Sequence, residues 1–191
     1  MASSSRVAIV RDNVGPVFAA LRELLNKQVL VGIPEDKTTR SDDDAITNAS
    51  IAYIHEFGSP AANIPARPFL IPGVQKAQAA AVNQLKKAAT YALNGEAGKS
   101  DGAMKSAGVV GSESVRNEII NGNFAPLSPR TIAARASHRG DSTRRQSETD
   151  YLRFVASGVE PGAAQAEVGI KPLINTGEML RSITFVVRTI K

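Results

Sequence analysis

Histidine and cysteine, the residue types most typical of metal sites and nucleophilic catalysis, are rare or absent in this sequence. The chain has two histidines, His55 and His138, far apart in sequence, and no cysteine. A zinc site would need both histidines together with carboxylates, and no spacing in the sequence arranges such a set. His55 stands next to Glu56 on a short predicted helix, where we interpret it as a structural hydrogen-bonding residue. No pair of carboxylates lies in an apolar stretch that would separate their pKa values. We therefore expect no enzyme, no metal site and no cofactor.

The residues Gly98-Lys99-Ser100 match the end of a phosphate-binding loop. That motif needs a glycine five positions before its Gly-Lys pair, and Leu93 occupies that position. A predicted helix also precedes the segment, where the nucleotide-binding fold requires a strand. We interpret residues 94–100 as a flexible break between helices. Three further glycines are expected to delay the next helix until about Ser112: Gly102, Gly108 and Gly111.

The periodicity of apolar residues predicts the main elements. Small and apolar residues recur every three or four positions from Val74 to Ala92, which predicts one long helix over 72–93. Runs of β-branched residues predict strands over 28–33 and 183–190, and a weaker one over 166–170. Shorter helices are predicted over 13–27, after Ser128, and after two asparagines that could cap them, Asn48 and Asn175.

These elements indicate an α+β fold in which the long helix and several short helices pack on a small mixed or antiparallel sheet. We expect residues 1–191 to form a single domain, with strand 183–190 inside the sheet. Residues 138–150 are almost devoid of apolar side chains, so we expect them to form a mobile Arg-rich loop. Only 5% of the residues are aromatic and tryptophan is absent. A core so thin suggests a protein that gains stability from its partners.

Charge is distributed unevenly along the chain. The formal net charge is +5, with an acidic segment over 35–44 and a basic segment over 130–153. Segments of opposite charge could pair between copies of the chain, or both could be solvated loops. No stretch approaches the roughly 20 apolar residues of a membrane span, and the N-terminus lacks the apolar run of a secretory signal. We therefore expect synthesis in the cytoplasm and no membrane contact.

Three segments resemble, in order, motifs of one protein family. The first joins Ala52-Tyr-Ile-His-Glu-Phe-Gly58 to Ile64-Pro-Ala-Arg-Pro-Phe-Leu70. The others are Pro126-Leu-Ser-Pro-Arg-Thr-Ile132 and Lys171-Pro-Leu-Ile-Asn-Thr-Gly-Glu-Met-Leu-Arg-Ser-Ile183. Together they resemble the tail-component or tail-completion proteins of tailed bacteriophages, which include neck and virion-morphogenesis proteins. The last segment departs from the family pattern by one additional residue between Gly177 and Leu180.

The resemblance implies a structural protein of the virion, made in the host cytoplasm. It implies a ring of copies of this chain, expected to be a hexamer that matches the symmetry of the tail, at the top of the tail or in the neck. The neighbours would be other neck, tail-terminator or tail-tube proteins, and DNA would be met only as it passes through the channel. We expect Phe69 to anchor the long helix. The candidate interface residues are Arg67, Phe69, Arg139, Arg144 and Arg145.

The alternative is a basic module that binds nucleic acid. The sequence pI of about 9.7 and the Arg-rich segment favour it. The basic segment has little aromatic interleaving for base stacking, however, and no recognisable reading helix. A salt titration would separate the two hypotheses, because a nucleic-acid binder loses affinity steeply as salt rises.

Overall fold

The computed structural model describes residues 14–37, 39, 46–137 and 142–190, with only the backbone of 142–144. In chain order the elements begin with α1 (Val14–Leu25), β1 (Lys27–Gly32), the 3-10 turn η1 (Glu35–Lys37), α2 (Asn48–Phe57) and the 3-10 turn η2 (Pro60–Ala62). Next come α3 (Leu70–Leu93), α4 (Ala97–Asn121), α5 (Pro129–Ser137), α6 (Ser142–Ala156), α7 (Pro161–Glu167), α8 (Glu178–Ser182) and β2 (Thr184–Thr189). The predicted α+β fold is confirmed, and α3 is the predicted long helix, begun two residues earlier.

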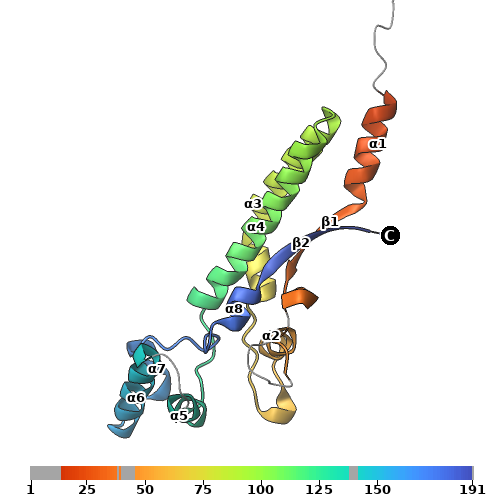
Figure 1. Ribbon diagram of the computed structural model, residues 1–191. Helices are drawn as coiled ribbons and strands as arrows, with labels where there is room; N and C mark the ends of the chain where they lie inside the picture. Colours follow the sequence, from red (N-terminus) through yellow and green to blue (C-terminus); the bar gives the residue numbers. More distant parts are fainter. Residues whose placement is uncertain (1–13, 38, 40–45, 138–141, 191) are drawn as a thin grey trace, which may run out of the picture.

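A hairpin of two long helices, α3 and α4, forms the axis of the molecule (Figure 1). The two helices approach closely because small residues line their contact. A Cβ placed on Gly73 of α3 would lie 2.7 Å from the Cα of Val115 on α4. Near the end of the hairpin, the hydroxyl of Ser100 donates to the carbonyl of Ala88 at 2.9 Å. A side chain larger than hydrogen at Gly73 would therefore push the helices apart.

Helix α4 runs without interruption through the glycines that were expected to delay it until Ser112, so that prediction is wrong. The physical reason is tertiary contact with the sheet. A Cβ on Gly108 would overlap the ring of Phe185 in β2, and one on Gly111 would lie 2.8 Å from Cγ2 of Val31 in β1. The glycines weaken the helix locally, by about 1 kcal/mol each relative to alanine, but they allow the sheet to lie directly on the helix.

Strands β1 and β2 pair antiparallel, with Val29 opposite Val187 and Leu30 opposite Val186. Within the described residues the sheet has these two strands only, so β2 does not lie inside a sheet as predicted. Helix α4 makes the main contact with both strands. Helix α3 reaches them near its C-terminal end, where Ala88 and Tyr91 share an apolar cluster with Val29 and Val187.

The described residues bury three separate apolar clusters, which is consistent with a chain poor in aromatic residues. The first lies at the base of the hairpin, where α3 begins and α4 ends. It includes Phe69, Val115, Ile119, Leu173, Met179 and Ile183. The second, near the other end of the hairpin, is built on Ala88, Ala103 and Met104. The third holds α5, α6 and α7 together through Leu127, Ile132, Tyr151 and Ala164. These three helices form a small lobe beside the base of the hairpin (Figure 1).

The small lobe corrects two predictions. The expected mobile loop over 138–150 is helical from Ser142 onward, because Glu148, Tyr151, Leu152 and Val155 recur at helical spacing and face the lobe. Residues 138–141 lie outside the described part of the chain. The strand predicted over 166–170 is also wrong: Pro161 starts helix α7, and the Glu160 carboxylate caps it by accepting the backbone N–H of Ala163 at 2.9 Å.

Two predicted helix caps are replaced by neighbouring residues. Thr47 caps α2 through its hydroxyl, which accepts the backbone N–H of Ser50 at 3.1 Å. Asn48 is instead buried, with its amide directed at the carbonyls of Lys37 and Thr39. Helix α8 is preceded by Gly177 in the left-handed conformation, and not by Asn175. In the part of the chain that the structure describes, no helix is long and apolar enough to cross a membrane.

The contact between Gly108 and Phe185 yields a stability prediction with a matched control. Gly108→Ala should lower the free energy of unfolding, because the new methyl group forces the β2 strand away from α4. Gly102→Ala lies on the same helix with open space around the added carbon, and should raise it by about 0.5–1 kcal/mol. Urea unfolding of both variants measures the difference. Equal stabilisation by both substitutions would contradict the close packing of helix and sheet.

Candidate partner-binding surface

The side chain of Glu56 joins helix α2 to the first turn of helix α3. Its carboxylate is buried and accepts three backbone N–H groups: those of Phe69 and Leu70, each at 2.8 Å, and that of Ile71 at 3.0 Å. Phe69, the residue before α3, offers no side-chain cap of its own. The first backbone N–H groups of a helix have no partner within it and carry partial positive charge. A carboxylate brought from another helix satisfies them.

Arg67 fixes the link between α2 and α3 to the segment that follows α4. Its guanidinium donates to the carbonyls of Ala125 at 2.8 Å and Pro126 at 2.9 Å, and its backbone N–H donates to the carbonyl of His55 at 2.6 Å. The side chain is almost fully buried, and burial lowers the pKa of the guanidinium from its usual value. Arg67 therefore binds the segment that leads from α4 into the small lobe.

The structure describes three of the five candidate interface residues with their side chains: Arg67, Phe69 and Arg145. Phe69 is 1% exposed and confirms the predicted anchor. Both Arg67 and Phe69 lie inside the chain's own fold, which removes them as direct partner contacts, because their side chains are already covered. Arg145 is exposed on α6. The side chain of Arg144 and the whole of Arg139 lie outside the described residues.

His55 lines a small polar cavity of about 180 Å³ together with Arg135, Thr176 and Met179. Within the described structure its buried Nδ1 has no hydrogen-bond partner. Burial, and to a lesser degree the positive charges of Arg67 and Arg135, together lower the pKa of His55 to about 4. The imidazole is thus neutral at physiological pH, but among the residues that the structure describes the structural hydrogen bond expected from the sequence is not formed at Nδ1.

An apolar groove opens beside the Glu56 cap. It has a volume of about 220 Å³ and is bounded by the end of β1, helix α2 and the start of α3. Its lining is almost entirely apolar and includes Ile33, Ala52, Phe57, Leu70 and Ile183. Tyr53 and Phe57 stand at its rim with ring centroids 4.9 Å apart, and they are 65% and 57% exposed.

Sequence reasoning does not find this groove, because Ile51, Ile54 and Phe57 recur at helical spacing and predict a single stripe on one side of the helix. In the structure Phe57 faces outward with Tyr53. The signal that could have found it is the pair of aromatic residues four positions apart, since such residues lie on the same side of a helix. Ile71, at the start of α3, is also half exposed beside the groove.

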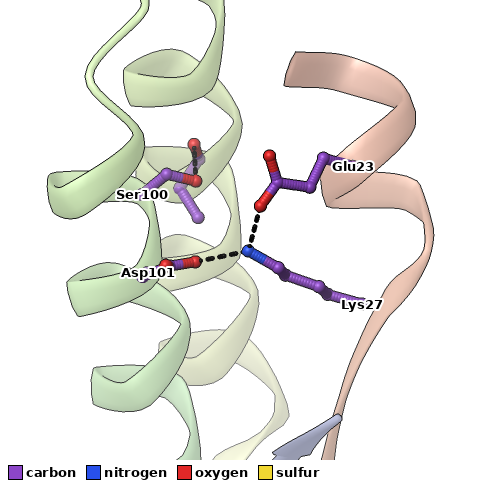
Figure 2. A network of polar contacts seen from close by, with 5 residues as sticks. Glu23, Lys27, Ser100 and Asp101 are labelled. Atoms are coloured by element: carbon purple, nitrogen blue, oxygen red, sulfur yellow. Dashed lines mark hydrogen bonds and ion pairs between the residues drawn. The ribbon is translucent and has the colours of Figure 1, made fainter. Parts of the chain in front are cut away.

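Helix α1 presents a second apolar face. Phe18 and Leu25 are 67% and 77% exposed. They are seven residues apart and therefore lie on the same side of the helix. Figure 2 shows what holds α1 in place: Nζ of Lys27 lies 2.6 Å from a carboxylate oxygen of Glu23 on α1 and 2.8 Å from one of Asp101 on α4. The hydrogen bonds to Asp101 and Glu23 raise the pKa of Lys27. The apolar face of α1 therefore points away from the hairpin.

Comparisons of the chain with protein-family models, with curated proteins and with solved structures find no match. The phage-family resemblance therefore rests on its motif residues and remains a hypothesis. Among the described residues, no group of three histidine or carboxylate side chains could hold a metal ion. The arrangement best suited to binding is the combination of the apolar groove and the apolar face of α1.

The Glu56 cap predicts a large effect from a small change. Glu56→Gln keeps the size of the side chain, but it removes the charge and turns an N–H donor toward the backbone N–H groups. We expect a loss of roughly 2–4 kcal/mol from the free energy of unfolding. Glu113→Gln is the matched control, because Glu113 forms an exposed ion pair with Arg116 and should cost less than about 1 kcal/mol. Chemical unfolding would reveal the contrast, and equal effects would contradict the role given to Glu56.

The lowered pKa of His55 predicts loss of stability in acid. The folded state holds a pKa of about 4, below the usual 6.5, so the unfolded chain binds the proton first and protonation favours unfolding. The contribution is fully present above pH 6.5 and is lost as the pH falls toward 4. Melting temperatures across this range should fall more steeply for the wild type than for His55→Gln. Parallel curves for the two proteins would show that His55 does not titrate in this way.

Proposed function

We propose that this chain is a structural protein of a tailed-bacteriophage virion. It forms part of a ring at the top of the tail or in the neck, where it completes the tail and joins it to the head. The ring consists of copies of this chain, six in number, and it contacts neighbouring neck, tail-terminator or tail-tube proteins. DNA passes through the channel of the ring.

The observation that carries this proposal is the exposed apolar surface on a chain with a thin core. An apolar groove with aromatic residues at its rim, together with the exposed face of α1, gives the protein two surfaces that resemble interface patches more than ordinary solvent-exposed surface. Such surfaces fit a protein whose exposed apolar side chains become buried when it assembles with its partners. Binding of this kind needs no catalytic side chains.

The motif residues support the proposal in a second way. Glu56, Arg67 and Phe69 belong to the segments that resemble the phage family, and each has a physical role at one junction. Glu56 caps α3, Arg67 ties the link to the small lobe, and Phe69 fills the core beneath it. A pattern required by the fold in this way would be expected to recur in proteins that share the fold.

The test uses the phage genome that encodes the chain. Disruption of its gene should leave heads and tails unjoined, and a plasmid copy of the wild-type gene should restore joining. A labelled chain in purified particles should be located at the junction of head and tail, with sixfold symmetry about the tail axis. Normal particles without the chain would overturn the proposal. So would steeply salt-dependent binding of the purified chain to DNA combined with its absence from the particles.

A further inference from the structure

We propose that the apolar face of α1 in one copy of this chain docks into the apolar groove of the next copy. The inference deepens the proposed ring and rests on it for the repetition of the contact. The contact joins two different surfaces, with Phe18 and Leu25 on one side and the groove rimmed by Tyr53 and Phe57 on the other.

The two surfaces cannot meet within one chain. Helix α1 precedes β1, and the groove begins where β1 ends, at Gly32 and Ile33. A strand of this length spans about 20 Å, and α1 extends from the start of β1 away from α2 (Figure 1). The network of Lys27 with Glu23 and Asp101 fixes that direction. Only another copy can place an α1 face against this groove.

The sizes of the two surfaces match. A cavity of about 150 Å³ with an apolar lining is large enough to admit benzene. The groove measures about 220 Å³, so it has room for the ring of Phe18. The lining is apolar apart from Tyr53, which is exposed at the rim, and Glu56, whose carboxylate is already occupied by the N-terminus of α3. An apolar side chain could therefore enter without leaving a polar group unsatisfied.

The charges beside the two surfaces are opposite. Arg22 lies next to Phe18 and Leu25 on the helical projection of α1, and its side chain is exposed. Glu35 and Asp36 are exposed in η1, two and three residues after Ile33 of the groove. Docking would bring the guanidinium toward these carboxylates, and such complementarity fixes the orientation of two partners.

A contact between two different patches repeats in one direction. Each added copy leaves one free groove and one free α1 face, until rotation closes the series into a ring or extends it into a filament. If the angle between copies lets both contacts form between the same two chains, the series instead closes as a reciprocal two-fold dimer. A wild type that stops at dimers would contradict the ring, and larger oligomers would support it.

The test mixes two variants of the full-length chain in sedimentation velocity. Phe18→Ser removes the docking side chain and Phe57→Ser alters the groove, and both positions are exposed, so both variants should fold. The wild type should form oligomers as its concentration rises, whereas each variant should associate roughly thirtyfold more weakly. An equimolar mixture should form a one-to-one dimer through the intact face of one variant and the intact groove of the other.

Charge reversal and a surface control complete the design. Arg22→Glu alone, or Glu35→Arg with Asp36→Arg, should weaken association, and the three changes in one chain should restore it. Val82→Ser, an exposed apolar residue on α3, should leave association unchanged. A wild type that stays monomeric, a mixture without dimers, or loss of association in Val82→Ser would each overturn the inference. Since these measurements use the purified chain, they stand or fall separately from its location in a phage particle.

Discussion

The arrangement of the molecule depends on one buried carboxylate. Glu56 accepts three backbone N–H groups at the start of α3. This cap fixes where α3 begins and its direction relative to α2. A buried charge is costly unless its hydrogen bonds are satisfied, and the positive end of a helix satisfies this one. Because the same helix α2 forms a wall of the apolar groove, the cap also fixes the shape of the proposed docking surface.

The hairpin that starts at this cap depends on small residues. Gly73 allows α3 and α4 to approach, and Gly108 allows β2 to lie on α4. Close approach of the backbones replaces the large side chains that usually fill a core. The sheet has two strands in the described residues and could not be stable alone, so α4 supplies the apolar surface that it needs.

Arginine side chains that donate to backbone carbonyls link the small lobe to the hairpin. Arg67 reaches Ala125 and Pro126, and Arg135 reaches Pro172 and Ile174 at 3.1 and 3.3 Å. Arginine suits this role because its planar fork can serve two acceptors at once. The junction brings together the three segments that resemble the phage family, which lie far apart in the sequence. Separate apolar clusters joined in this way allow the lobe to shift without unfolding of the hairpin.

The sequence by itself determined the elements whose signal is local. The repeat from Val74 to Ala92 predicts α3, and β-branched runs predict both strands, because periodicity and propensity act within a few residues. It also predicts the burial of Phe69. Only the tertiary structure decided that α4 continues through Gly108, that residues from Ser142 onward are helical, and that Arg67 lies inside the fold. Each depends on contacts with other segments of the chain: Phe185 for Gly108, the apolar cluster of the small lobe for the helix from Ser142 onward, and the carbonyl of Ala125 for Arg67. At Gly108 such a contact outweighs a local helix preference of about 1 kcal/mol. Local spacing carries no information about which distant segments meet.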